Sequence, residues 1–309
     1  MKKSYDPARR RAIQALAAVG AAAMSMRSMA EPAPAMIKRP IPSSGELLPV
    51  VGLGTYQSFD VGADAGEREP VRQVLRLFAQ QGGTVVDSSP MYGPSESVVG
   101  DLAAELGLIG KLFMATKVWT SGKDAGIAQM EESMRRMKVE RMDLMQIHNL
   151  LDWKTHLATL KQWKAAGRVR YIGITHYHSG AYADLERLMK TGDYDAVQFN
   201  YSIAEREAEQ RILPLAQEAG IAVIVNRPFA QASLFSRVRG KTVPEWATEF
   251  DCQSWAQFFL KYILGHPAVT CVIPATAKPQ HLADNMMAGV GRLPDEKTRR
   301  KMVAFMDSL

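Results

Sequence analysis

The sequence predicts a (β/α)8 barrel preceded by a β-hairpin. Short apolar, β-branched runs alternate with helical segments, and this alternation implies parallel strands joined by crossover helices. Eight such runs in roughly 270 residues are typical of this barrel. Four of them end near Asp87, Lys117, His148 and His176, at intervals of 30, 31 and 28 residues. A doubly wound sheet is the alternative, but its GxGxxG turn is incomplete in "GLGTYQSF".

The individual elements follow in order along the chain. Residues 31–50 contain "SSGE" between two short apolar pieces, which predicts a hairpin leading into the barrel. In "AGIAQMEESMRRMK" the apolar residues share one helical face, as is typical of core packing. We therefore expect residues 31–309 to form one domain. The oligomeric state is left open, with a monomer favoured. The eight predicted strands are "VVGLGTY", "TVVDSS", "LFMATKV", "DLMQIHN", "VRYIGITH", "DAVQFNYS", "IAVIVNRPF" and "TCVIPAT".

Residues 1–30 have the composition of an export signal. Arg9, Arg10 and Arg11 precede an uncharged, alanine-rich run at residues 12–26. A helix of that length spans about 23 Å, short of the roughly 30 Å of a bilayer core, which disfavours a membrane anchor. The segment resembles a bacterial twin-arginine signal cleaved after Ala30, which implies the twin-arginine export machinery as a partner and a periplasmic location. An ordinary secretory signal, an uncleaved helix, a basic tail and a cytoplasmic location are the alternatives.

The distribution of charge argues against one class of function, nucleic-acid binding. The net charge is +6, and residues 1–30 carry all but about one unit of it. The body of the chain therefore lacks the basic patch that nucleic-acid binding requires, and no nucleic-acid partner is expected. We expect Cys252 and Cys271 to be buried free thiols, and His156 and His266 to lie on the surface.

Polar side chains at the ends of successive strands predict a reactive site. Asp87, Lys117 and His148 end three successive strands, and Tyr92 lies in the "SSPMYG" turn beyond the first of them. The carboxyl ends of barrel strands meet at one mouth, so these four groups should converge there. A buried acid and lysine persist as a pair, and a nearby cation lowers the pKa of a tyrosine.

At these residues the sequence resembles the aldo-keto reductases over residues 36–290. The motifs "GLGTY", "SSPMYG" directly after Asp87, "ATKVW", "MDLMQIHN", "YIGITH", "VQFNYS" and "VIPAT…HLADN" occur in order. The resemblance implies that Asp87, Tyr92, Lys117 and His148 form a catalytic tetrad. Tyr92 would protonate the carbonyl oxygen of an aldehyde or ketone as a nicotinamide donates hydride. Lys117, held by Asp87, would tune Tyr92, and His148 would orient the small carbonyl substrate.

The same resemblance implies a nicotinamide cofactor, NADP over NAD. The family's pattern places Asn226 where many members have a tyrosine that stacks on the nicotinamide, so stacking must come from Arg227, which follows it, or be lost. Lys278 or His281 would reach the 2′-phosphate, although the usual cationic pattern is thinner here. The 228–251 segment is long for a loop and is expected to fold over the cofactor. The implied cofactor contacts are Gly54, Thr55, Thr175, His176, Gln198, Asn226, Arg227, Thr276, Lys278, His281, Asp284 and Asn285.

Tyr56 and Trp119 are predicted to flank the substrate in an open, aromatic-walled pocket. Two other classes remain open. A non-catalytic, nicotinamide-nucleotide-binding barrel with a regulatory role could keep the tetrad. A metal-dependent barrel hydrolase would need ligands such as His148, His176 and Asp87, but Lys117 among them would repel a cation, so no metal is expected.

Overall fold

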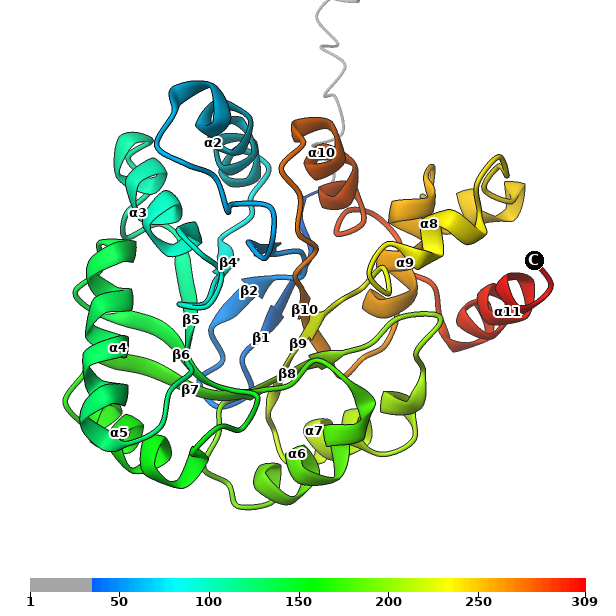
Figure 1. Ribbon diagram of the computed structural model, residues 1–309. Helices are drawn as coiled ribbons and strands as arrows, with labels where there is room; N and C mark the ends of the chain where they lie inside the picture. The colour runs from blue at the N-terminus through cyan, green and yellow to red at the C-terminus, as the bar shows by residue number, and fades with distance from the viewer. Residues whose placement is uncertain (1–34) are drawn as a thin grey trace, which may run out of the picture. The chain divides into compact units, whose positions relative to one another are not determined.

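Eight parallel strands pair with their neighbours in chain order and are surrounded by helices (Figure 1). This is a computed structural model, and it describes residues 35–309. The bridges Val51–Val272 and Gly54–Ala275 connect the last strand to the first. The predicted (β/α)8 barrel is confirmed, and the doubly wound alternative is wrong because the strand order never reverses. The export signal predicted for residues 1–30 lies outside the described residues.

All eight predicted strands are present. They are β3 (Leu53–Gly54), β4 (Val85–Asp87), β5 (Phe113–Val118), β6 (Met142–His148), β7 (Val169–Thr175), β8 (Ala196–Asn200), β9 (Ala222–Asn226) and β10 (Val269–Val272). The predicted hairpin precedes them as β1 (Lys38–Pro40) and β2 (Leu47–Pro49), with Gly45 in its turn at φ +76°.

Eight helices follow the barrel strands, one after each strand, and the first seven of them form the crossovers. They are α2 (Ala65–Gln80), α3 (Ser95–Glu105), α4 (Lys123–Met137), α5 (Trp153–Ala165), α6 (Tyr182–Met189), α7 (Ile212–Glu218), α9 (Trp255–Leu264) and α10 (Pro279–Met287). Residues 35–309 also contain two further helices, α8 (Ser233–Arg237) and α11 (Glu296–Asp307), and three 3-10 turns, η1 (Ser179–Ala181), η2 (Glu207–Glu209) and η3 (Glu245–Phe250).

Local sequence explains where these helices begin and which face they bury. Helix α2 begins after Asp64, whose side chain accepts hydrogen bonds from the backbone N–H groups of Gly66 and Glu67. Its buried residues Val71, Val74, Leu75 and Phe78 follow helical spacing. In α4 the predicted methionine face, Met130, Met134 and Met137, is buried in the core.

The barrel interior changes from apolar to polar along its strands. Side chains alternate along a strand, so Phe113, Ala115 and Lys117 of β5 face one side. The first two belong to an apolar cluster with Ile41 and Leu48 of the hairpin, and the third does not. Strand β6 repeats the pattern with Leu144 followed by Gln146 and His148. The apolar layers and the hairpin therefore fill one end, and polar residues collect at the carboxyl end.

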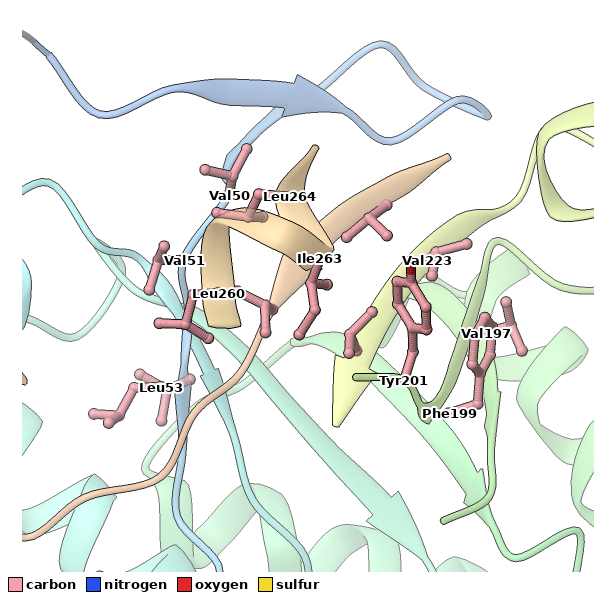
Figure 2. Packing of buried hydrophobic residues seen from close by; sticks show 14 of the residues in the cluster. Val50, Val51, Leu53, Val197, Phe199, Tyr201, Val223, Leu260, Ile263 and Leu264 are labelled. Carbon is pink, nitrogen blue, oxygen red and sulfur yellow. The ribbon is translucent and has the colours of Figure 1, made fainter. Parts of the chain in front are cut away.

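A second, larger core lies between the strands and the helices. Figure 2 shows part of it, where Leu260, Ile263 and Leu264 of α9 lie between Val50 and Val51 on one side and Val223 on the other. Cys252 and Cys271 are buried free thiols, as expected. None of the described helices is long and apolar enough to cross a bilayer.

The long segment between β9 and α9 carries α8 and η3, and its contacts go to the outside of the barrel. Phe235 packs on Phe259 of α9, and Trp246 packs on Phe258 and on Phe305 of α11. The Arg237 guanidinium donates to the backbone of Met306. These contacts tie the segment to α9 and α11, which is not the arrangement of a free flap over the barrel mouth.

Candidate active site

The four residues predicted to form the reactive site meet at the carboxyl end of the barrel. Asp87 ends β4, Lys117 lies one residue before the end of β5, and His148 ends β6. The Lys117 ammonium lies 5.0 Å from the centre of the Tyr92 ring. The Tyr92 and His148 rings meet edge to face at 6.1 Å between centroids. Neighbouring parallel strands in register place these groups together, as the barrel prediction requires.

Lys117 and Asp87 form a buried ion pair. The lysine Nζ donates to Asp87 Oδ2 at 2.6 Å and to the Ser88 carbonyl at 2.7 Å. Both side chains are almost wholly excluded from solvent. Burial alone lowers the pKa of Lys117, but Asp87 and Tyr92 oppose it and hold the pKa above its usual value. Lys117 is therefore a permanent cation beside Tyr92 near neutral pH.

Tyr92 is held by the turn between β4 and α3. Its backbone N–H donates to the Ser89 carbonyl at 3.0 Å. Gly93 follows at φ +55°, where an added Cβ would lie 2.4 Å from Asp60 Oδ1, so only glycine fits. Burial raises the pKa of the Tyr92 phenol, and Lys117 lowers it by a smaller amount. The expected effect of Lys117 is present, but burial prevails and keeps the phenol protonated.

His148 is neutral at the mouth of the barrel. Burial, the Lys117 charge and His176 together lower the pKa of His148 to about 3. Its Nδ1 lies 3.1 Å from the Ser89 hydroxyl. A hydroxyl that donates to Nδ1 leaves the ring proton on Nε2, which makes this nitrogen a hydrogen-bond donor.

Two glutamines hold the other oxygen of Asp87, and one of them was not predicted. Gln146 and Gln198 each donate from Nε2 to Asp87 Oδ1 at 2.9 Å. Gln198 Oε1 accepts from Thr175 at 3.2 Å and from Asn226 at 3.3 Å. Gln146 lies two residues before His148 inside an apolar strand run. A polar residue in such a run is the sequence signal that identifies it.

The predicted cofactor contacts from the early and middle strands border this network. Gly54 and Thr55 are buried, and the Thr55 hydroxyl donates to the Asp87 carbonyl at 3.0 Å. Asn226 donates to the His176 carbonyl at 3.0 Å. Its Oδ1 is buried and meets no donor within residues 35–309, so one acceptor of the side chain is left unpaired.

The Arg227 side chain, expected to stack on the nicotinamide, already packs on an aromatic ring of the chain. Its guanidinium lies 4.5 Å from the centre of the Tyr177 ring. Tyr177 also stacks on His176 at 5.2 Å, and His178 lies edge-on to His176 at 4.3 Å. Arg227 has φ +49°, a left-handed backbone that places its side chain over this aromatic group.

The remaining predicted cofactor residues gather at the start of α10. Lys278 and His281 are exposed, and Thr276 is buried with its hydroxyl accepting from the Lys278 N–H at 3.0 Å. Asp284 accepts from Gln257 at 2.7 Å, and Asn285 is buried. The helix N-terminus beside two exposed basic side chains favours an anion.

Tyr56 and Trp119 lie at the rim of the site and remain exposed. Tyr56 is 51% exposed and its ring lies 5.0 Å from that of Tyr92. Trp119 is 40% exposed and lies 6.3 Å from the ring of His148. Met91 and Tyr177 are the other large exposed apolar side chains in the loops after β4 and β7. The substrate side is thus open and lined with aromatic residues.

The surface prediction for His156 was wrong, and residues 35–309 contain no metal-ligand cluster. His156 is fully buried on α5, where its Nε2 lies 2.7 Å from the Thr120 carbonyl, whereas His266 is half-buried. His156 lies on the core-facing side of its helix, which the local sequence did not reveal. Among residues 35–309, no three His, Cys, Asp or Glu side chains gather where they could hold a metal ion.

Comparisons with known proteins agree with this geometry. The model of the Aldo/keto reductase family matches residues 50–301. "Methylglyoxal reductase YeaE" of Escherichia coli is 30% identical over 262 residues, which cover 81% of this chain and 89% of the relative. "Methylglyoxal reductase DkgB" of Yersinia pestis is 27% identical over 78% of this chain and 87% of its own.

A solved structure also matches over most of its length. The crystal structure of an aldo-keto reductase from Klebsiella pneumoniae in complex with NADPH is 25% identical, with a TM-score of 0.71. The match covers 88% of this chain and 95% of the Klebsiella chain. The matched segment contains the barrel and all four convergent residues, so the chain belongs to the aldo/keto reductase family.

Proposed function

We propose that the protein is an NADP-dependent aldo-keto reductase that reduces small aldehydes or ketones to alcohols. The observation that carries the proposal is the buried Asp87–Lys117 pair beside the protonated phenol of Tyr92 and the neutral imidazole of His148. When bound, the nicotinamide supplies the hydride. Membership of the family and the NADPH complex of the Klebsiella relative support this cofactor.

The residues of the chain would supply position and the proton. Tyr92 donates its phenolic proton to the carbonyl oxygen, and the Lys117 cation stabilises the phenolate that remains. His148 donates a hydrogen bond from Nε2 to the same oxygen and thereby orients the substrate. Asp87 keeps Lys117 in place. Tyr56 and Trp119, exposed at the rim of the site, would contact the apolar side of the substrate.

Side chains of this chain are placed where they could bind the nicotinamide end and the 2′-phosphate end of the cofactor. The free acceptor of Asn226, beside Thr175 and His176, would hold the nicotinamide carboxamide. Lys278 and His281 at the start of α10 would bind the 2′-phosphate. These placements favour NADP over NAD.

The assay is the fall in nicotinamide absorbance when purified protein is mixed with NADPH and methylglyoxal, a substrate suggested by the names of two relatives. Tyr92→Phe protein is the control for reduction by trace contaminants. A non-catalytic nucleotide-binding barrel would bind NADPH in the same mixture without consuming it.

We also propose that residues 1–30 are a cleaved twin-arginine signal and that the mature domain, residues 31–309, works in the periplasm. The support is the placement of Arg9, Arg10 and Arg11 before an uncharged, alanine-rich run. Fractionation of cells that express the full chain, with mass measurement of the periplasmic form, tests both parts.

A further inference from the structure

The Asp87 carboxylate uses both oxygens, and only one of them contacts Lys117. Oδ2 accepts from Lys117 at 2.6 Å. Oδ1 accepts two amide donors, Gln146 Nε2 and Gln198 Nε2, both at 2.9 Å. Gln146 is 0% exposed and Gln198 is 2% exposed, so no solvent replaces these bonds.

The orientation of the two amides is fixed by their partners. An ionised carboxylate only accepts hydrogen bonds, so each glutamine must turn its NH₂ group toward Asp87. Gln198 then presents Oε1 to the Thr175 hydroxyl and the Asn226 amide, both of which donate. Gln198 Nε2 also lies 3.1 Å from Gln146 Oε1. The result is a continuous hydrogen-bond network from β9 to β4 across the barrel interior.

We propose that Gln146 and Gln198 are positioning residues of the reduction, which keep Asp87 ionised and Lys117 protonated beside Tyr92. The inference rests on the proposed function, because it concerns the proton that Tyr92 donates. It goes beyond that function by assigning a role to Gln146. It also gives Gln198 a role inside the barrel that is separate from cofactor contact.

The physical reason is the instability of a poorly solvated carboxylate. Without amide donors on Oδ1, the buried Asp87 anion loses much of its stabilisation. A proton can then move from Lys117 to Asp87: one N–H bond breaks, one O–H bond forms, and the pair becomes neutral. Tyr92 would lose the cation that stabilises its phenolate, and its pKa would rise further.

Other charged or titratable groups also face this centre, and none replaces the two amides. Glu96 of α3 acts on Lys117 from outside the barrel and is bonded to Thr116. Cys271 of β10 is a thiol whose pKa burial raises beyond its usual range. The groups that face the centre are Asp87, Lys117, Tyr92, Tyr56, His148, His176, Glu96 and Cys271.

The two glutamines differ in a way that makes the inference testable. Gln198 also contacts Thr175 and Asn226, which border the proposed carboxamide site. Among the described residues, the side-chain hydrogen bonds of Gln146 go only to Asp87 and Gln198. Loss of the Gln146 amide should therefore change proton transfer alone, whereas loss of the Gln198 amide should also weaken nucleotide binding.

The experiment uses Gln146→Met and Gln198→Met, which keep side-chain length and remove the donors. The pH dependence of kcat/KM for methylglyoxal reduction is measured with saturating NADPH. We expect the alkaline limb to move up by about one pH unit and the plateau to fall about tenfold in both variants. The NADPH dissociation constant, measured by fluorescence, should stay unchanged in Gln146→Met and rise in Gln198→Met.

A readout independent of activity is an ultraviolet difference titration of Tyr92. The titration curve of each glutamine variant is compared with that of the same variant carrying Tyr92→Phe, without cofactor. The difference isolates the Tyr92 phenol, and its midpoint should rise when either amide is removed. If Gln146→Met does not fold, Gln146→Asn replaces it, because the shorter side chain moves the amide away from Asp87 and remains polar.

Gln257→Met is the matched control, because Gln257 is a buried glutamine that donates to a carboxylate, Asp284, away from Tyr92. It should leave the alkaline limb and the Tyr92 midpoint unchanged. Folded Gln146 variants with the wild-type limb and midpoint would overturn the inference. Wild-type protein that reduces no carbonyl would instead overturn the proposed function, while the Tyr92 midpoint would still test the glutamines.

Discussion

The Lys117 ammonium lies 5.0 Å from the centre of the Tyr92 ring at the barrel mouth, where Lys117 is fully buried and Tyr92 is half-buried. Lys117 and Tyr92 shift each other's pKa in opposite directions. Burial raises the pKa of Tyr92 and Lys117 lowers it, while the phenolate helps to raise the pKa of Lys117. The pair therefore holds a proton on Tyr92 and a cation ready to stabilise the phenolate once that proton leaves.

Tyr92→Phe should abolish carbonyl reduction and leave nucleotide binding nearly intact. The substitution removes only the phenol, and the ring still packs against Tyr56 and His148. Proton-transfer groups contribute roughly 10²–10⁴-fold to a rate. Steady-state rates with methylglyoxal and fluorescence titration with NADPH check the two parts. A variant that retains more than about a tenth of the wild-type rate would exclude Tyr92 as the acid.

Lys117→Met should lower activity and move the alkaline limb of the pH–rate profile upward. Without the cation, only burial and Asp87 act strongly on the Tyr92 phenol, and both raise its pKa. The substitution also leaves the Asp87 carboxylate buried without its charge partner, which typically costs about 3–5 kcal/mol of stability. The profile is measured below the melting temperature of the variant, and an unmoved limb would contradict the tuning role.

Much of this site could be predicted from the sequence, because parallel barrel strands end at one mouth. Asp87, Lys117 and His148 end successive strand runs, and Tyr92 follows in a Gly/Pro turn, so their convergence requires only the fold. Gln146 was missed because it lies inside a strand run rather than at its end. Its role depends on the direction in which the side chain points, which pairing with β5 and β7 determines.

The surface prediction for His156 failed because tertiary packing decides which side of a helix is buried, and the prediction for residues 228–251 stays a prediction. His156 has polar neighbours in the sequence, but α5 turns it onto a core where Gly126 leaves room for its ring. The prediction that residues 228–251 fold over the cofactor rested on the length of this segment alone. Its aromatic residues Phe235, Trp246 and Phe250 instead pack among aromatic side chains of α9 and α11. A single sequence does not reveal which distant helix will receive such residues.

Lys278→Ala should reduce the preference for NADPH over NADH by about tenfold. Lys278 is exposed immediately before α10, whose N-terminus favours an anion, and a charge-assisted contact to a phosphate contributes roughly that much. Dissociation constants for both nucleotides, measured with wild type and variant, provide the test. Lys297→Ala, an exposed lysine on α11, should change neither constant. Equal wild-type affinities for the two nucleotides would refute the proposed phosphate site.

His266 should make the fold sensitive to mild acid. Burial, Arg299 and Arg39 lower the pKa of His266 to about 4, with Glu209 opposing them. The unfolded chain binds this proton below about pH 6.5, so stability is complete above that pH and declines toward the folded pKa. His266→Asn, which keeps an acceptor for the Ala268 N–H, should recover roughly 1–2 kcal/mol at about pH 5.

Urea unfolding at neutral and acidic pH measures this recovery. His178→Asn is the control, because it is the same substitution at an exposed histidine. If both variants lose the same unfolding free energy between the two pH values as the wild type, another group governs the acid sensitivity.

The last prediction concerns how an exported reductase obtains its cofactor. The proposed twin-arginine signal contains Arg9, Arg10 and Arg11 before its uncharged run, and the twin-arginine route carries folded proteins. Nicotinamide nucleotides are made and recycled in the cytoplasm, so we expect the domain to fold and bind its nucleotide there before export. Retention over hours requires slow release, which usually accompanies tight binding. Protein purified from the periplasm and then denatured should release nearly stoichiometric nucleotide. Arg10→Lys/Arg11→Lys should retain the precursor in the cytoplasm, whereas Lys2→Arg/Lys3→Arg, which leaves the arginine pair intact, should not. An exported protein that is empty and binds added NADPH only weakly would show that the periplasmic form does not act as a reductase.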